Sequence, residues 1–285
     1  MDAETDLLTL QQAATMIGCH YQTMYRRVRS GEIPALVVGG TYRLRRADVA
    51  DWLVRRDAIA GAVAGRKERD WPRQSELLLK HLLAGDTDAA RRQIDRLLGG
   101  GASAADCCDR LFAPALSEIG RLWREGKVAI AEEHRAARAV EGLLERISAA
   151  RSKPGPRLGT IVVATAAGDA HALAALMVAT GLRAEGFTVH YLGAGLPAEE
   201  IVELAVRERA DLVALSCCVP EHEGLRSAIA ALAAAGYETI VGGRGIDRTE
   251  TLALGGVDYG GSIGEAQRIA RDRIRQVAAA ADSVV

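Results

Sequence analysis

The stretch GDAHALA, residues Gly168–Ala174, sets a carboxylate and an imidazole two positions apart. A histidine in a loop of this kind can ligate a metal through one ring nitrogen. Asp169, or another nearby acid, can accept the N–H of the second nitrogen and so fix the tautomer. The residues therefore predict metal ligation by His171 with Asp169 behind it. The competing interpretation is an ordinary loop histidine that is hydrogen-bonded to a carboxylate.

The elements around this loop are typical of an α/β domain over residues 157–285. The expected strands are TIVVATA, TVHYLG, LVALSCC, ETIVGG and VDYGG. The expected helices lie around 172–185, 198–209, 223–235 and 263–279. Continuous apolar strands that alternate with helices predict a doubly wound, five-stranded parallel sheet with helices on both faces. Ligands of such sheets bind at the carboxyl ends of the strands, which is where His171 is expected.

Three small residues are expected at the same edge of the sheet. Ser216 lies at the end of the third strand, and Gly242 and Gly243 end the fourth. Because none of them has a bulky side chain, a long ligand tail could pass beside them.

Together, these positions resemble the cobalamin-binding domain of methionine synthase, of corrinoid carriers and of related sensors, which is a flavodoxin-like, Rossmann-like fold. The resemblance implies that His171 is the lower axial ligand of cobalt, in place of the cofactor's own dimethylbenzimidazole, and that Asp169 supports it. It also implies that the freed nucleotide tail is buried beside Ser216, Gly242 and Gly243.

Two positions depart from the family pattern. The family motif is Asp-x-His-x-x-Gly, followed by Ser-x-Leu or Ser-x-Thr. In this chain Ala174 stands at the position of the motif glycine, and Cys218 stands at the position of the Leu or Thr. An extra methyl group at a close-packed site could shift the tail or the loop by a fraction of an ångström.

Residues 75–152 have a helical pattern, with apolar stripes that are interrupted by glycines. The expected helices lie near 75–83, 87–98, 103–125 and 128–150. Four such segments predict a small four-helix bundle. Pro114 should kink the third helix or lie in its first turns. The preceding residues, 61–74, mix small residues, charges and a proline, as a linker does.

The bundle contains LWREGKVAIAEEH, which places Trp123 ten residues before the pair Glu133 and His134. This spacing resembles the signature of CarH-type, light-responsive repressors, in which Trp, Glu and His enclose the upper axial adenosyl group of adenosylcobalamin. An indole face can pack on that group, and Glu and His offer it hydrogen bonds. The competing interpretation makes Trp123 a bundle-core aromatic and His134 a surface residue.

Arg124 follows the tryptophan, where such repressors can place a second histidine on cobalt once the adenosyl group has gone. A guanidinium is not a practical cobalt ligand at neutral pH. Water or His134 could take that place. Alternatively, the site could also hold a linear tetrapyrrole such as biliverdin, with Arg124 paired to a propionate.

The N-terminal residues, 1–60, carry a basic module. From Gln11 to Arg56 there are eight arginines and three acids, a net charge of +5, which suits an anionic partner. Helices near 10–18 and 20–30 precede two alternating strands that are joined at Gly39-Gly40, and a helix carries Trp52. This order predicts a winged helix-turn-helix. It resembles the excisionase and MerR-related DNA-binding modules.

The expected partner of this module is double-stranded operator DNA. The second helix would enter the major groove, with Gln22, Arg26 and Arg27 as base readers and Tyr21 beside them. On the wing, the residues expected to contact phosphates are Arg43, Arg45 and Arg46.

The start of the chain carries acids where a secretory signal would be basic, and no apolar run reaches membrane-spanning length. We therefore expect a cytoplasmic protein without a membrane partner.

The three segments together predict a transcriptional regulator, not an enzyme, that senses adenosylcobalamin. Resemblance to the CarH-type family implies that the dark form assembles, as a tetramer, on its operator. Light would cleave the cobalt–carbon bond, break the assembly and release DNA. The alternative is a corrinoid methyl carrier, since those proteins also place a helical bundle before a cobalamin domain.

Overall fold

The structure is a computed structural model that describes residues 7–16, 20–29, 33–50, 52, 69–150 and 157–282. The chain forms two compact units, Met1–Arg69 and Asp70–Val285. The predicted ends of the first two helices, at Gly18 and Ser30, lie outside the described residues, as does most of the predicted linker.

The first unit combines short helices with a three-stranded antiparallel sheet in the order β1-β3-β2. Its elements are β1 (Leu7–Thr9), α1 (Leu10–Met16), α2 (Tyr21–Arg29), β2 (Leu36–Val38) and β3 (Thr41–Arg45), and residues 46–50 are helical. Thr9 and Gln12 exchange hydrogen bonds between side chain and backbone at the start of α1, which is a capping box. The hairpin turns at Gly39 and Gly40, whose φ values are 58° and 75°. The sequence did not predict β1, which pairs with β3 through only three residues.

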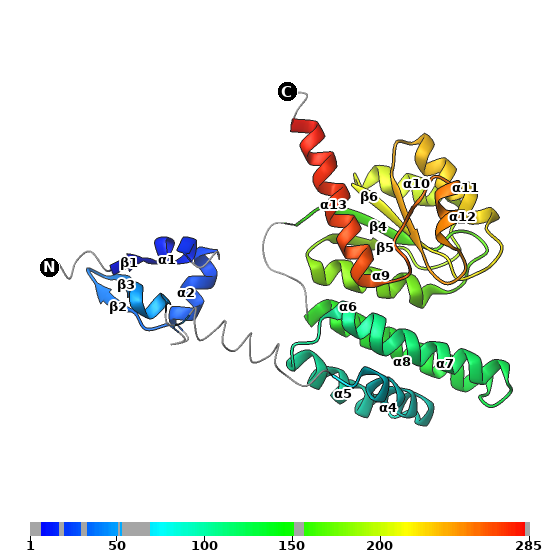
Figure 1. Cartoon of the computed structure of the whole chain (residues 1–285), viewed down its shortest axis with the longest axis horizontal. Helices are drawn as coiled ribbons and strands as arrows, with labels where there is room; N and C mark the ends of the chain where they lie inside the picture. Colours follow the sequence, from blue (N-terminus) through cyan, green and yellow to red (C-terminus); the bar gives the residue numbers. More distant parts are fainter. Residues whose placement is uncertain are drawn as a thin grey trace. The chain divides into compact units, whose positions relative to one another are not determined.

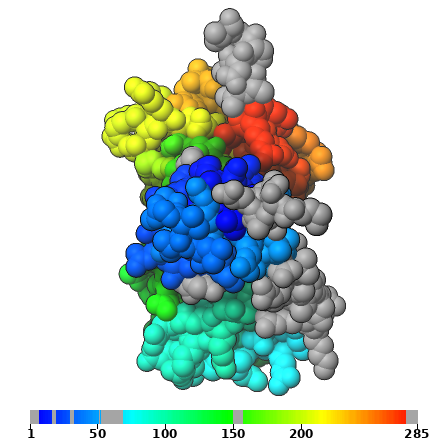
Figure 2. Space-filling model, turned by 90° about the vertical axis from the view of Figure 1, so that its left-hand side faces the viewer, coloured from blue at the N-terminus to red at the C-terminus, as the bar shows by residue number. Residues whose placement is uncertain are grey.

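A small apolar core holds this unit together, and Trp52 and Met24 are its largest members. Leu44 of β3 points into it, so that Arg43 and Arg45 lie on the opposite face of the strand. Figure 2 shows one face of the unit, coloured blue, as a compact cluster of side chains.

The second unit begins with a helical bundle. Its elements are α4 (Trp71–Ala84), α5 (Thr87–Gly99), α6 (Ala104–Cys107), the π-helical turn η1 (Cys108–Phe112), α7 (Ala113–Arg124) and α8 (Ile130–Ala150). Helix α4 begins at Trp71, so its first four residues belong to the predicted linker of residues 61–74. Asp70 caps the helix by accepting a hydrogen bond from the Arg73 backbone N–H, and Pro72 occupies its first turn.

The third helix of the bundle changes its pitch locally near Pro114, which the sequence predicted to kink the helix or to lie in its first turns. α6, η1 and α7 follow one another without a break over residues 104–124, and Pro114 lies in the first turn of α7. Proline cannot donate the hydrogen bond of a helix interior, and a π-turn accommodates this inside a continuing helix. Pro114 therefore changes the hydrogen-bond ladder of the helix without ending it.

A five-stranded parallel sheet forms the rest of the unit, in the order β5-β4-β6-β7-β8. Its strands are β4 (Thr160–Ala164), β5 (Thr188–Tyr191), β6 (Leu212–Ser216), β7 (Thr239–Gly242) and β8 (Val257–Asp258). Its helices are α9 (Ala172–Glu185), α10 (Ala198–Arg207), α11 (Glu223–Ala234), α12 (Arg248–Ala253) and α13 (Ile263–Asp282). The prediction of a doubly wound parallel sheet is confirmed, and the six-residue α12 was missed.

The sheet has helices on both of its faces (Figure 1). On one face, α9 and α13 pack on alternate strand residues such as Val163 and Ala214, and this core continues into the bundle. On the other face, α10 and α11 pack on Val162 and Val213. Because bundle and sheet share one core, the bundle has a defined position against the α9 and α13 face.

Asp109, in the π-turn, fixes the bundle to the α/β domain. Its carboxylate accepts hydrogen bonds from the backbone N–H groups of Ile263 (2.8 Å) and Gly264 (3.2 Å) and from the Ser262 hydroxyl (3.0 Å). It thus caps the N-terminus of α13, where the helix dipole favours a negative charge.

None of the helices in the described part of the chain has the length and hydropathy needed to cross a bilayer.

Candidate functional site

Asp169 and His171 form a tight pair in the loop between β4 and α9. The carboxylate Oδ1 of Asp169 lies 2.7 Å from Nδ1 of His171 and also accepts the His171 backbone N–H at 2.9 Å. Its Oδ2 accepts the backbone N–H of Cys218, which follows β6, at 2.6 Å. Asp169 therefore joins the ends of β4 and β6, the point at which the strand order reverses and at which such sheets bind ligands.

A second set of contacts, which the sequence did not predict, holds the loop from behind. The buried hydroxyl of Thr165 donates to the Asp169 carbonyl at 2.6 Å and accepts the Gly195 N–H at 2.9 Å. The Tyr191 hydroxyl donates to the Ala172 carbonyl at 2.9 Å. Thr165 is a polar residue at the end of an apolar strand, and this was the one sequence signal of its role. The backbone on both sides of His171 is therefore fixed.

The imidazole of His171 is suited to bind a metal through Nε2. Because a carboxylate can only accept, the neutral imidazole would carry its proton on Nδ1, which leaves the lone pair on Nε2 for a metal. The side chain is 61% exposed, whereas that of Asp169 is 4% exposed. Within the described residues, no group of three or more His, Cys, Asp or Glu side chains could hold a metal ion. A single imidazole fits a metal that arrives already held by a macrocycle, as cobalt is in a corrin.

Ser216, Gly242 and Gly243 lie where the sequence placed them, at the carboxyl ends of β6 and β7. A Cβ atom at Gly242 would overlap the ring of Tyr259, and one at Gly243 would overlap the carbonyl oxygen of Cys217. The glycine pair therefore allows close internal packing, a requirement that sequence reasoning did not find. Whether a ligand tail also passes here stays a prediction.

The Tyr259 side chain fills the space beside Gly242. It is 2% exposed, and burial raises the pKa of its phenol well above the usual range, although a hydrogen bond with Ser216 opposes this. Tyr259 is therefore a neutral, buried phenol beside the predicted tail-binding residues.

The two residues that depart from the family pattern are both partly buried. Ala174 lies in the first turn of α9. Cys218 follows β6, and burial, with the nearby Asp169 carboxylate, raises the pKa of its thiol. Its neighbour Cys217 is also buried, and its pKa rises to about 11. Both thiols stay neutral near pH 7.

The predicted cap residues lie at the exposed end of the bundle. Trp123 is 46% exposed, so it is not a core aromatic of the bundle. Glu133 and His134 begin α8 and are hydrogen-bonded to each other, with Oε2 and Nδ1 2.7 Å apart. The His134 side chain is 70% exposed, and Arg124 is exposed as well. These residues leave aromatic and polar groups available for a partner.

In the first unit, the exposed residues of α2 are Tyr21, Gln22, Arg26 and Arg29. Arg27 differs, because its guanidinium lies 4.5 Å from the ring centroid of Trp52 and the residue is half-buried. This cation–π contact assigns Arg27 a packing role that the sequence did not predict.

On the hairpin and just after it, Arg45 and Arg46 are exposed and Arg43 is half-buried. Arg43 and Arg45 share one face of β3, as alternate residues of a strand do. Arg45 and Arg46 therefore offer exposed positive charge at this end of the hairpin.

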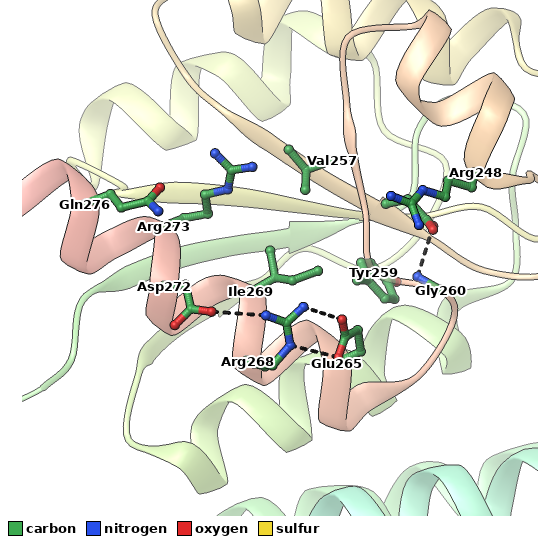
Figure 3. A pocket seen from close by; sticks show the side chains of 11 residues that line it. Arg248, Val257, Tyr259, Gly260, Glu265, Arg268, Ile269, Asp272, Arg273 and Gln276 are labelled. Atoms are coloured by element: carbon green, nitrogen blue, oxygen red, sulfur yellow. Dashed lines mark hydrogen bonds and ion pairs between the residues drawn. The ribbon is translucent and has the colours of Figure 1, made fainter.

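A separate pocket of about 530 Å³ lies between α12, β8 and α13 (Figure 3). Arg268 is held there by Glu265 and Asp272, and Arg273 forms an ion pair with Glu238. None of the predicted site residues lines this pocket.

Models of known protein families match three segments of the chain, which correspond to the three segments predicted from the sequence. Residues 159–271 and 74–148 match two models that are each described as a B12 binding domain, and residues 7–57 match a helix-turn-helix domain. The chain therefore has B12-binding domains preceded by a helix-turn-helix domain, which supports corrinoid binding.

Curated relatives match the corrinoid part. Dimethylamine corrinoid protein 1 of Methanosarcina acetivorans is 29% identical over 119 residues, which is 41% of this chain and 56% of the relative. Dimethylamine corrinoid protein 2 of the same organism is 27% identical over 176 residues, 59% of this chain and 81% of the relative. The match to the first relative thus spans little more than half of its length.

The fold has a counterpart among solved structures. The monomethylamine corrinoid protein of Methanosarcina barkeri superposes with a TM-score of 0.59 at 17% identity, covering 70% of this chain and 98% of that protein. At this identity the likeness concerns the fold alone.

Proposed function

We propose that this protein is a cobalamin-dependent, light-responsive transcriptional regulator of the CarH type, with adenosylcobalamin as its chromophore. The observation that carries the proposal is the combination, on one chain, of a helix-turn-helix domain and two B12-binding domains. DNA binding and cofactor binding would then be coupled within one molecule. Such a protein acts in the cytoplasm, where its operator DNA is.

The lower face of the cofactor would be held by His171, with Asp169 fixing the tautomer through the 2.7 Å contact. Ser216, Gly242 and Gly243 would border the nucleotide tail. When bound, adenosylcobalamin would supply a light-sensitive cobalt–carbon bond on the face opposite His171.

The upper face would be covered by Trp123, Glu133 and His134. An exposed indole offers an apolar surface for a nucleoside, and the two polar side chains offer hydrogen bonds. Arg124 would contact the periphery of the cofactor. An additional linear tetrapyrrole such as biliverdin is a variant of this proposal, and an absorption band to the red of cobalamin's after expression with biliverdin would support it.

The DNA contact would come from α2 and the β2–β3 hairpin, acting as recognition helix and wing. Gln22 and Arg26 are exposed on α2 and suit base edges. Arg45 and Arg46 suit phosphates. The half-buried Arg27, stacked on Trp52, would support the domain and not read bases.

Assembly would link the two functions. A cofactor shifts a protein between two arrangements only through its different affinity for each. If the arrangement with adenosylcobalamin associates, as a tetramer, several weak DNA-binding units act together and bind DNA far more tightly. Loss of the adenosyl group would remove the cofactor's preference for the associated arrangement.

The test is gel filtration with absorption detection of the protein loaded with adenosylcobalamin, in darkness and after illumination, for wild type and His171→Ala. We expect a larger dark species, a smaller illuminated one, and an altered spectrum in the variant. An elution volume that does not change with light would exclude the assembly switch. Failure of the wild type to bind cobalamin would exclude the proposal.

A second candidate function is methyl transfer as a corrinoid carrier, because the matched relatives are named dimethylamine corrinoid proteins. It leaves the helix-turn-helix domain without a role, and Trp123 would obstruct a methyltransferase from above. Methyl transfer from the methylcobalamin-loaded protein to the thiol acceptor of a corrinoid methyltransferase would favour this function.

A further inference from the structure

Arg244 directly follows the glycine pair at the end of β7, and its backbone is rigidly placed. A Cβ atom at Gly243 would overlap the Cys217 carbonyl oxygen, and one at Gly245 would overlap the Val219 carbonyl oxygen. The Gly245 N–H also donates to the Cys217 carbonyl at 3.0 Å. The loop after β7 therefore lies directly against the loop after β6, and Arg244 projects from a fixed position.

The Arg244 side chain is exposed and has a neutral partner. Its Nη1 donates to the Ser117 hydroxyl of α7 at 2.7 Å. In the described part of the chain, no carboxylate forms an ion pair with it, whereas Arg268 pairs with two carboxylates and Arg271 with one. A guanidinium that is bound only to a hydroxyl keeps most of its charge available for an anion.

Arg244 is also close to the cobalt-ligand loop. A hydrogen bond with the Arg244 backbone helps to lower the pKa of the Cys218 thiol, which is raised overall by burial. The backbone N–H of Cys218 in turn donates to Asp169, which holds His171. The positive charge of Arg244 thus lies beside the predicted cofactor site, between the carboxyl edge of the sheet and the bundle.

We propose that Arg244 binds the phosphodiester of the cobalamin nucleotide tail and so makes the site selective for complete cobalamins over corrinoids that lack the nucleotide. This inference rests on the proposed function. The rim of the corrin ring carries neutral amides, and the phosphodiester is the one anionic group of cobalamin. If the tail passes Ser216, Gly242 and Gly243, its charged part needs a cation at the exposed end of that path, because burying a charge without a partner is costly. Arg244 lies at that end.

The experiment measures dissociation constants by absorption titration of the full chain with hydroxocobalamin and with aquocobinamide, which has the same ring but no ribose phosphate or base. Arg244→Gln should weaken binding of hydroxocobalamin by about ten- to hundredfold, as expected for a hydrogen bond to a charged group. It should leave cobinamide binding unchanged. Arg244→Lys, which keeps the charge but loses the planar fork, should fall between wild type and Gln.

Two control variants separate the phosphate contact from other effects. Arg248→Gln removes the same charge from the exposed start of α12 and should bind both corrinoids as wild type does. Ser117→Ala removes the hydrogen bond between α7 and Arg244 but keeps the guanidinium, and should retain the preference for hydroxocobalamin.

Raising the salt concentration should reduce the preference in wild type more than in Arg244→Gln, because salt screens an exposed ion pair. Equal weakening of both corrinoids by Arg244→Gln would overturn the inference, since Arg244 would then act on the ring or on the loop. Loss of the preference in Ser117→Ala would also overturn it. If wild type binds neither corrinoid, the proposed function itself fails.

Discussion

The two predicted faces of the cofactor site differ in how far the protein alone organises them. On the lower face, Asp169 is 4% exposed and binds three groups, from His171 and Cys218. On the upper face, Trp123 is 46% exposed, and His134 is 70% exposed with Glu133 as its hydrogen-bond partner. The fold holds the lower ligand in position, and the cap residues keep part of their surface exposed for a ligand.

This difference assigns the two faces different tasks. A preorganised ligand loses little entropy on binding, so the lower face should determine whether any cobalamin binds. Exposed cap residues gain contacts only from the group that is bound above the ring. The upper face should therefore determine which axial group is preferred. Variants of the two faces should separate affinity from selectivity.

His171→Ala should have the largest effect, because it removes the ligand that the lower face presents. Uniformly ¹⁵N-labelled protein, loaded with unlabelled cobalamin and reduced to the Co(II) form, should show the two-line electron paramagnetic splitting of an axial ¹⁵N. The variant should lose that splitting. In wild type, a three-line pattern from the cofactor's own benzimidazole nitrogen would contradict ligation by the protein. His134→Ala is the control and should keep the two lines.

Asp169→Asn should have the second-largest effect. One carboxylate oxygen of Asp169 accepts from His171 and the other from Cys218, and in the variant an NH₂ group would replace one of these two acceptors. We expect cobalamin affinity to fall by about ten- to hundredfold. The free energy of unfolding should fall by about 1–3 kcal/mol, because a buried group loses a partner. Titration and urea unfolding measure the two effects. An unchanged affinity would remove the claim that the lower face is preorganised through Asp169.

Trp123→Ala should change selectivity more than stability. Loss of an aromatic contact should reduce the preference for adenosylcobalamin over hydroxocobalamin by about three- to tenfold. The exposed indole contributes little packing, so the free energy of unfolding should change by no more than about 0.5 kcal/mol. A large loss of stability with unchanged selectivity would make Trp123 a structural residue. Competition titration and thermal unfolding decide between the two.

Glu133→Gln should have the smallest effect. Gln keeps the length and can still pair with His134, so the preference for adenosylcobalamin should fall by about threefold or less. The measurement is the same competition titration. A loss of all cobalamin binding would contradict the division of tasks between the two faces.

The contrast between the faces also explains what could be predicted from sequence. The sequence correctly predicted that Asp169 and His171 lie in the loop after the first strand of the parallel sheet. The alternation of apolar strands with helices identifies this sheet, and the loops after its strands lie at the carboxyl edge. The contacts that support Asp169 and His171 were harder to predict, because Tyr191 reaches Ala172 across 19 positions and Gly195 reaches Thr165 across 30.

Other misses have the same physical origin. Asp109 caps α13 across more than 150 positions of sequence. Arg27 stacks on Trp52, which shares an apolar core with Met24 and Val28 of α2. Short elements were also missed, since β1 and α12 are too brief to show a period. The capping box of Asp247 and Glu250 was the available signal for α12.

The most direct test of the account is the dissociation constant for a DNA duplex obtained by selection from random sequences, measured for the protein without cofactor, with adenosylcobalamin in darkness, and after illumination. If the cofactor controls assembly, the dark adenosylcobalamin form should bind about a hundredfold tighter than the other two. Equal dissociation constants in all three states would contradict the account, because cobalamin and DNA would then bind independently.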